Sequence, residues 1–148
     1  MALNPLGKYA FWILSRAGLA IYSRCPIFGT LRVVLGVIRN QDSFLVIERN
    51  DGRGVSFPGG IALPWESAEK TAQREIWEET GLRVTKSVLK LRYFSSVEIP
   101  VDVSVFEIEA DGQLRASWEG TPRWLHLDEL RQRVLPSQRR VVESLSQP

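Results

Sequence analysis

Residues 60–82 read GIALPWESAEKTAQREIWEETGL, and this stretch carries an uneven share of the chain's charge. The 148 residues hold 17 acidic and 19 basic side chains, so the formal net charge is only +2. Five of the acids nevertheless fall within 14 positions: Glu66, Glu69, Glu75, Glu78 and Glu79. The overall balance gives no general attraction to nucleic acid, and no specific nucleic-acid partner is expected. The acidic cluster is therefore the feature to explain.

The composition of residues 67–80 predicts a helix that ends at Gly81. On this helix Glu75, Glu78 and Glu79 are spaced i, i+3 and i+4, which places three carboxylates on one face. Like charges at these spacings repel unless they face bulk water or bind a cation. Oxygen ligands without histidine or cysteine favour Mg²⁺, with Mn²⁺ as the alternative, over zinc.

Residues around this helix agree with a cation site. Glu66 lies nine residues before Glu75, so we expect it near the start of the helix and able to fold back. Arg74 can orient a carboxylate through a bidentate contact. Gly59 and Gly60 allow the backbone to come close to a ligand or to another segment.

The rest of the chain alternates between strand and helix patterns. We expect strands at 31–38, 44–48, 84–95, 101–109 and 123–127, the first two forming a hairpin. Asp128 is placed to N-cap a short helix through Val134, and residues 137–145 predict a closing helix. This order predicts a mixed α/β fold with a sheet covered on both faces.

The full pattern of residues 60–82 resembles the Nudix box, G-x5-E-x7-R-E-U-x-E-E-x-G-U, in which U is an aliphatic residue. Every specified position matches: Gly60, Glu66, Arg74, Glu75, Ile76, Glu78, Glu79, Gly81 and Leu82. The resemblance implies an α/β/α sandwich around a mixed sheet. Residues 29–148 would form the Nudix hydrolase domain, and residues 1–28 an N-terminal helical extension that the motif does not explain.

The activity that the resemblance implies is hydrolysis of a diphosphate bond in a nucleoside diphosphate linked to another moiety. Glu119 resembles a further family carboxylate, although its other interpretation is a loop glutamate in water. The implied metal ligands are Glu75, Glu78, Glu79 and Glu119, and the implied substrate-binding residues are Gly59 and Gly60.

The resemblance also implies roles in proton transfer and support. The general base would be Glu79 or Glu75, with Glu119 as the alternative on a distant loop. Arg74 would complete the catalytic residues by fixing a carboxylate, and Glu66 would support the helix. An alternative function is a non-catalytic Nudix-fold module that binds or senses a nucleotide, although the intact carboxylates argue against it.

Three further residues receive weaker interpretations. Trp77 points away from the apolar stripe of the helix, so we expect it at a helix edge or a partner surface. The apolar loop that ends at Trp65 would bury itself, meet a partner or stack on a base. His126 is expected to be a structural strand residue.

The N-terminal segment contains two short apolar runs, YAFWIL at 9–14 and GLAIY at 18–22. Neither approaches the roughly 18 residues of a membrane-spanning helix. We expect an amphipathic helix packed on the domain or at a homodimer contact, with peripheral membrane attachment or a cleaved signal as alternatives. A single cysteine, Cys25, precludes an intrachain disulfide, so a cytoplasmic location is the default.

Overall fold

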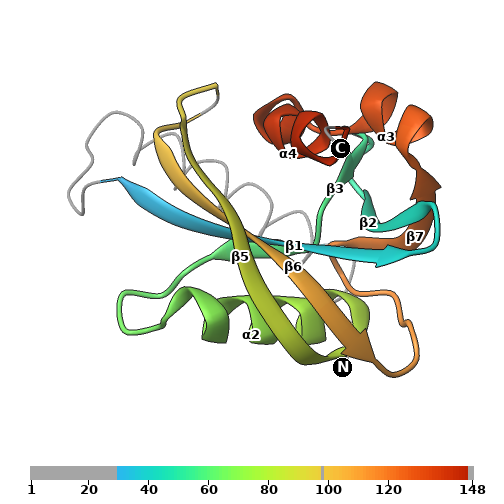
Figure 1. Ribbon diagram of the computed structural model, residues 1–148, viewed down its shortest axis with the longest axis horizontal. Coiled ribbons are helices and arrows are strands. Elements are labelled where there is room, and N and C mark those ends of the chain that lie inside the picture. The colour runs from blue at the N-terminus through green and yellow to red at the C-terminus, as the bar shows by residue number, and fades with distance from the viewer. Residues whose placement is uncertain (1–29, 98, 147–148) are drawn as a thin grey trace, which may run out of the picture.

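The computed structural model describes residues 30–97 and 99–146, and the predicted N-terminal helix lies outside them. The strands are β1 (Leu31–Asn40), β2 (Ser43–Arg49), β3 (Val55–Ser56), β4 (Gly59–Ile61), β5 (Arg83–Ser95), β6 (Val101–Asp111) and β7 (Gly120–His126). The helices are α2 (Ala68–Thr80), α3 (Leu127–Arg133) and α4 (Arg139–Leu145), with a 3₁₀ turn η1 (Pro136–Gln138) before α4. Helix α2 covers one face of the sheet, and α3 and α4 lie on the other (Figure 1). The predicted α/β/α sandwich is confirmed.

Strand β1 is the centre of the sheet. It pairs with β6 in parallel from Leu31 to Ile38, and with β4 in antiparallel from Val33 to Leu35. Its last residues turn into β2, so the predicted hairpin is confirmed. Strand β2 continues the sheet through β3 and β7, and β5 pairs with the outer side of β6. The parallel pairing of β1 with β6, beside the antiparallel pairings of the other strands, makes the sheet mixed.

The uninterrupted apolar run of β1 follows from burial on both faces. Leu35 and Val37 pack into the core beneath α3 and α4. Val34 and Ile38 point the other way, into a second core that contains Ile76 of α2. Two hydrophobic cores therefore hold the helices against opposite faces of one sheet.

Helix α2 has a defined boundary at each end. The Ser67 hydroxyl accepts a hydrogen bond of 3.2 Å from the Lys70 N–H, which caps the first turn. Gly81 adopts a left-handed conformation (φ 78°), and its N–H donates to the Trp77 carbonyl at 3.0 Å. The predicted helix and its glycine C-cap are thus confirmed.

Two predicted helix starts were wrong. Asp128 does not cap α3, because β7 runs directly into the helix and the extended residue His126 occupies the cap position. The closing α-helix begins at Arg139 rather than at Ser137, because Pro136–Gln138 form the 3₁₀ turn first. No helix within the described ranges is long and apolar enough to cross a membrane.

Candidate active site

Gly59 and Gly60 belong to β4, a short strand that the sequence did not predict. Their pairing with Leu35 and Val34 holds β4 beside β1. The Gly59 N–H donates a hydrogen bond of 2.8 Å to the Glu79 carboxylate. Gly59 has a φ of 153°, and a Cβ at this position would collide with the Val34 carbonyl. Glycine therefore allows β4 to lie between β1 and the carboxylate.

Glu79 is buried at the C-terminal end of α2, with 5% of its surface exposed. Burial, followed by a side-chain hydrogen-bonding contact and charge repulsion with Glu119, raises the pKa of Glu79 well above its usual range. Two carboxyl groups in one partly buried place favour a shared proton or a bound cation. The structure thus brings together one residue from α2 and one from the segment before β7.

Glu75 lies one turn earlier on the same side of α2 and is also buried. A Cβ at Gly60 would stand against the Glu75 carboxylate, so only glycine leaves this space to the acid. Arg74 approaches the Glu75 carboxylate at 2.7 Å. Burial raises the pKa of Glu75, although the Arg74 contact acts in the opposite direction.

Glu66 folds back over the start of α2 and holds Arg74 from the other side. Its carboxylate accepts from the Arg74 Nε at 2.8 Å and from the Nη2 at 3.0 Å, a bidentate pair. The Thr71 hydroxyl donates to the same carboxylate at 3.0 Å. These contacts, the Arg74 hydrogen bond first among them, lower the pKa of Glu66 to about 2. Arg74 is therefore fixed in place to position Glu75.

Glu78 is the exposed member of the predicted carboxylate face. Its carboxylate approaches Arg74 at 3.4 Å, on the solvent side of the helix. Within residues 30–97 and 99–146, no three acidic, histidine or cysteine side chains are gathered closely enough to hold a metal ion as they stand. The acids instead form two adjacent groups: Glu79 with Glu119, and Glu75 and Glu78 around Arg74.

Glu119 owes its position to the turn between β2 and β3. The Asn50 N–H donates to the Glu119 carbonyl at 3.1 Å, and the Asn50 side chain donates to the Trp118 carbonyl at 2.9 Å. The Ser117 hydroxyl accepts a hydrogen bond of 3.2 Å from the Glu119 N–H. These bonds therefore fix the backbone of Trp118 and Glu119 to the β2–β3 turn and to Ser117.

Arg49, at the end of β2, is a neighbour of the site that the sequence analysis missed. Its guanidinium forms an ion pair of 2.6 Å with Asp51. This contact, with smaller effects from the charges of Glu119 and Glu79, raises the pKa of Arg49. An arginine before a turn-rich loop gives no sequence signal of this kind, because its neighbours in space lie on distant segments.

Arg32 on β1 was missed for the same reason. Its Nη2 donates to the Leu63 carbonyl at 2.9 Å and to the Glu66 carbonyl at 3.2 Å. These bonds fix the loop before α2 to the sheet. Trp65 in that loop is 79% exposed, so the loop does not bury its tryptophan within the described structure.

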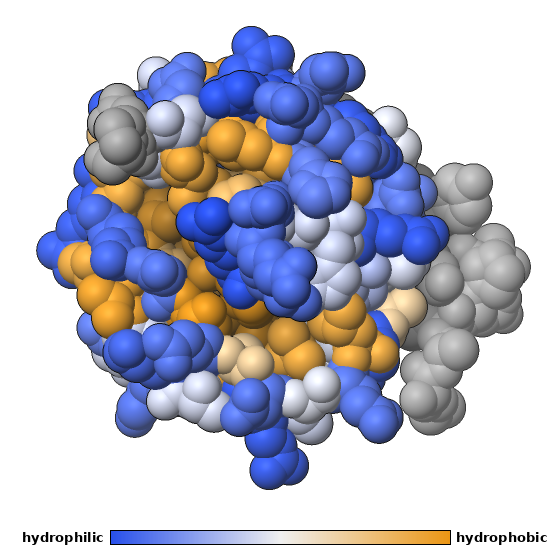
Figure 2. All heavy atoms as spheres, turned by 45° about the vertical axis from the view of Figure 1, so that its right-hand side comes forward, coloured by the Kyte–Doolittle hydropathy of each residue, from blue (hydrophilic) through white to orange (hydrophobic). Residues whose placement is uncertain are grey.

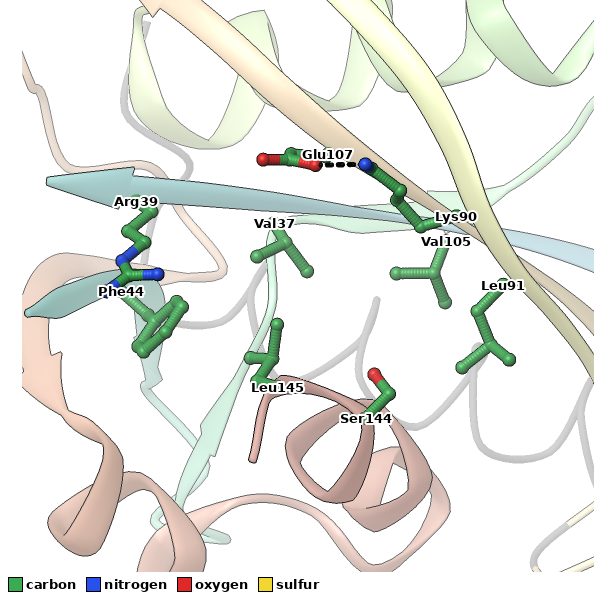
Figure 3. Close-up of a pocket in the computed structure, with 9 residues that line it drawn as sticks. All are labelled: Val37, Arg39, Phe44, Lys90, Leu91, Val105, Glu107, Ser144 and Leu145. Atoms are coloured by element: carbon green, nitrogen blue, oxygen red, sulfur yellow. Dashed lines mark ion pairs between the residues drawn. The ribbon is translucent and has the colours of Figure 1, made fainter. Parts of the chain in front are cut away.

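A separate cavity of about 390 Å³ lies between α4 and the sheet (Figure 3). Val37, Phe44 and Leu145 supply apolar walls, and an ion pair of 2.8 Å between Lys90 and Glu107 also lines it. None of the candidate site residues lines this cavity. In the space-filling view, hydrophobic surface lies around a central group of hydrophilic side chains, and further hydrophilic side chains stand at the rim (Figure 2).

Comparison with known proteins identifies the family of the chain. The family model of the NUDIX domain matches residues 29–145, which is most of the chain. The chain belongs to the NUDIX domain family. It is a Nudix hydrolase, an enzyme that acts on phosphorus-containing anhydrides, and the resemblance found in residues 60–82 is confirmed. Nudix hydrolases generally use divalent cations such as Mg²⁺.

This Nudix hydrolase is similar in sequence to two named relatives and in fold to a solved structure. A "MutT-like protein" of Streptomyces ambofaciens is 35% identical over 74% of this chain and 71% of its own. The "Putative 8-oxo-dGTP diphosphatase YtkD" of Bacillus subtilis (strain 168) is 37% identical, with 49% of this chain and 54% of that protein aligned. The MutT NUDIX hydrolase of Burkholderia pseudomallei superposes with a TM-score of 0.71 at 20% identity, covering 79% and 98% of the chains. This last likeness shows the shared fold.

Proposed function

We propose that this Nudix hydrolase cleaves a diphosphate bond in a nucleoside diphosphate linked to another moiety, with Mg²⁺ as its cofactor. The observation that carries the proposal is the buried Glu79 carboxylate, which accepts a hydrogen bond of 2.8 Å from the Gly59 N–H and lies within the electrostatic influence of Glu119 and Glu75. A buried carboxylate with further acids beside it attracts a hard cation, and a cation attracts a diphosphate.

The donor set fits Mg²⁺, with Mn²⁺ as the alternative. Every candidate ligand offers carboxylate oxygen, the ligand type that these cations prefer. A bound cation would also relieve the repulsion between Glu79 and Glu119. When bound, Mg²⁺ would acidify a water and stabilise the leaving phosphate. The residues that would hold it are Glu75, Glu78, Glu79 and Glu119.

Glu79 is the first choice for the general base. A bound cation would oppose the burial and the Glu119 charge that raise its pKa, so that the Glu79 carboxylate would be ionised and able to accept a proton. Glu75 and Glu119 are the alternatives, since both stand beside it. Arg74 would keep the Glu75 carboxylate in place, and Glu66 would keep Arg74 in place.

The substrate assignment builds on the YtkD relative. Its name describes an 8-oxo-dGTP diphosphatase, so oxidised and ordinary nucleoside triphosphates are the first compounds to test. Nucleoside diphosphates joined to a sugar or to a second nucleoside form the second group. Release of inorganic pyrophosphate or of a monophosphate would identify the bond that is cleaved.

The deciding experiment compares the wild type with Glu78→Gln on this panel, with and without Mg²⁺. We expect metal-dependent turnover by the wild type and an Mg²⁺ requirement raised about 10- to 100-fold in Glu78→Gln. Glu69→Gln is the matched control, because Glu69 is an exposed acid in the first turn of the same helix. Tight nucleotide binding without turnover on every compound would instead support a non-catalytic binding module.

The division of the chain at residue 28, a homodimer, peripheral membrane contact and a cytoplasmic location all stay predictions. The first three depend on residues 1–29, which lie outside the described structure. Gel filtration and vesicle flotation of the full chain, compared with a variant lacking residues 1–28, would test these three together. Cell fractionation would test the location.

A further inference from the structure

Glu119 differs from the other three candidate metal ligands because it does not belong to α2. It ends the segment of residues 112–119, which connects β6 to β7 and passes beside the C-terminal end of α2 (Figure 1). The separation between its carboxyl group and that of Glu79 therefore depends on what attaches this segment to the helix.

Arg115 makes that attachment in three ways. Its backbone N–H donates to the Thr80 carbonyl at 2.9 Å. Its side-chain Nη2 donates to the Trp77 carbonyl at 3.3 Å. Its guanidinium carbon stands 4.7 Å from the centroid of the Trp77 ring, within the range of a cation–π interaction.

The C-cap of α2 leaves room for this attachment. A Cβ at Gly81 would lie only 2.7 Å from the Arg115 Cγ. The same glycine that ends the helix therefore also lets the arginine lie across its last turn. Trp77 occupies a position of the Nudix box whose identity the motif leaves open, between Ile76 and Glu78.

We propose that Trp77 and Arg115 form an anchor that positions Glu119 against Glu79. The anchor fixes residues 112–119 from the helix side, four residues before Glu119, while Asn50 fixes Trp118 and Glu119 from the β2–β3 turn. Both are positioning residues: they act through Glu119 on the cation site. The inference rests on the proposed function, because it gives Glu119 its role as a metal ligand.

Arg83 provides a matched control. Its guanidinium carbon stands 5.2 Å from the centroid of the same Trp77 ring, but it extends from the start of β5 rather than from the segment that carries Glu119. Arg83→Ala therefore removes a cation from the ring and leaves the anchor intact. Arg115→Ala removes a cation from the same ring together with the Nη2 bond to the Trp77 carbonyl, and keeps only the backbone bond to Thr80.

The experiment measures Mn²⁺ binding by electron paramagnetic resonance, which does not depend on turnover. We expect Arg115→Ala and Trp77→Ala to raise the Mn²⁺ dissociation constant about 10-fold or more, the size of effect seen when supporting residues of a metal site are removed. Arg83→Ala is expected to stay close to the wild type. Arg115→Lys and Trp77→Phe keep a cation and a ring, so they are expected to recover part of the affinity.

A double-mutant cycle with Glu119→Gln tests whether the anchor acts through Glu119. Arg115→Ala should weaken Mn²⁺ binding in the wild-type background and have little further effect once Glu119 is glutamine. Hydrogen exchange of the Glu119 and Gly120 amides should accelerate in Arg115→Ala and not in Arg83→Ala.

The outcomes separate this inference from the proposed function. Wild-type affinity in Arg115→Ala, or equal losses in Arg115→Ala and Arg83→Ala, would overturn the anchor while the hydrolase proposal stands. Additive losses in the cycle would also overturn it. A wild type that hydrolyses nothing on the panel and binds no Mn²⁺ would overturn both.

Discussion

The Gly59 N–H and the Glu79 carboxylate are joined by a hydrogen bond of 2.8 Å, which links the short strand β4 to the buried side of α2. This link requires β4 to lie so close to β1 that no side chain fits at Gly59. The strand and the helix therefore position the acid jointly, and substitutions at the two glycines of β4 should have separable effects.

Gly59→Ala should destabilise the fold. The new Cβ would collide with the Val34 backbone carbonyl, and the φ of 153° disfavours any side chain. We expect a loss of about 2 kcal/mol or more in the free energy of unfolding, measured with urea. Gly52→Ala is the control, because Gly52 also has a positive φ (73°) but nothing lies within 4 Å of its Cβ position. Equal losses in the two variants would contradict the collision.

Gly60→Ala should reduce activity more than stability. Its Cβ would meet the carboxylate of Glu75, the end of a side chain that can turn aside, rather than backbone. We expect kcat to fall about 10- to 100-fold through displacement of Glu75, while the urea midpoint changes less than in Gly59→Ala. An unchanged kcat would show that Glu75 does not need its present position.

The ion pair between Glu66 and Arg74 should make stability depend on acidity. The Arg74 contact lowers the pKa of Glu66 from 4.5 to about 2. The pair therefore stabilises the fold above pH 4.5, and this stabilisation disappears as the pH falls toward 2. The difference in unfolding free energy between the wild type and Glu66→Gln should shrink across this window. Glu69→Gln, on the exposed side of α2, serves as the comparison. A difference that stays constant through the window would exclude the pair as its source.

Mg²⁺ should stabilise the wild type against heat. A ligand that binds only the folded state adds about 2.7 kcal/mol at 100 times its Kd, so the Tm should rise with the Mg²⁺ concentration. Glu79→Gln should lose most of this rise and about 10²- to 10⁴-fold in kcat, because it removes the proposed base. Differential scanning fluorimetry with Mg²⁺ and with EDTA measures the shift. A full shift in Glu79→Gln would remove this residue from the metal site.

The Tyr93 phenol should ionise at a higher pH than an exposed tyrosine. Burial raises its pKa from 10.0 to about 12, and its hydroxyl donates a hydrogen bond of 3.0 Å to the Ser137 carbonyl, which requires the neutral form. The neutral Tyr93 phenol therefore stabilises the fold below pH 10, and this stabilisation is lost as the pH rises toward 12. Subtracting the ultraviolet titration of Tyr93→Phe from that of the wild type should isolate this one phenol. A midpoint near 10 in the difference would contradict the burial.

The sequence predicted the features that depend on local patterns. Helix α2, its Gly81 cap and the two-faced burial of β1 follow from periodicity and composition that neighbouring residues supply. The α3 cap was misplaced because Asp128 has the better capping side chain, yet the direct continuation of β7 into the helix left that position to His126. The connection of β7 to α3, rather than the capping preference of Asp128, therefore decides where this helix begins.

Most of the candidate site was predictable because a motif covers it. Residues 60–82 lie on one continuous segment, so their spacing indicates a shared function. Arg49 and Arg115 reach the site from other segments, and their contacts depend on how β2 and the β6–β7 connection pack against α2. Strand β4 has only three residues and is defined by pairing with β1, which no local pattern encodes.

The attachment of Arg115 to the end of α2 divides the β6–β7 connection into two parts with different tolerance for change. Between Arg115 and Glu119 the number of residues is fixed, since one extra residue would carry the carboxyl group away from its partner on the helix. Before Arg115, around the exposed residues Gly112 and Gln113, extra chain can loop into solvent at little cost. Insertions that lengthen this connection during evolution should therefore accumulate on the β6 side of the arginine.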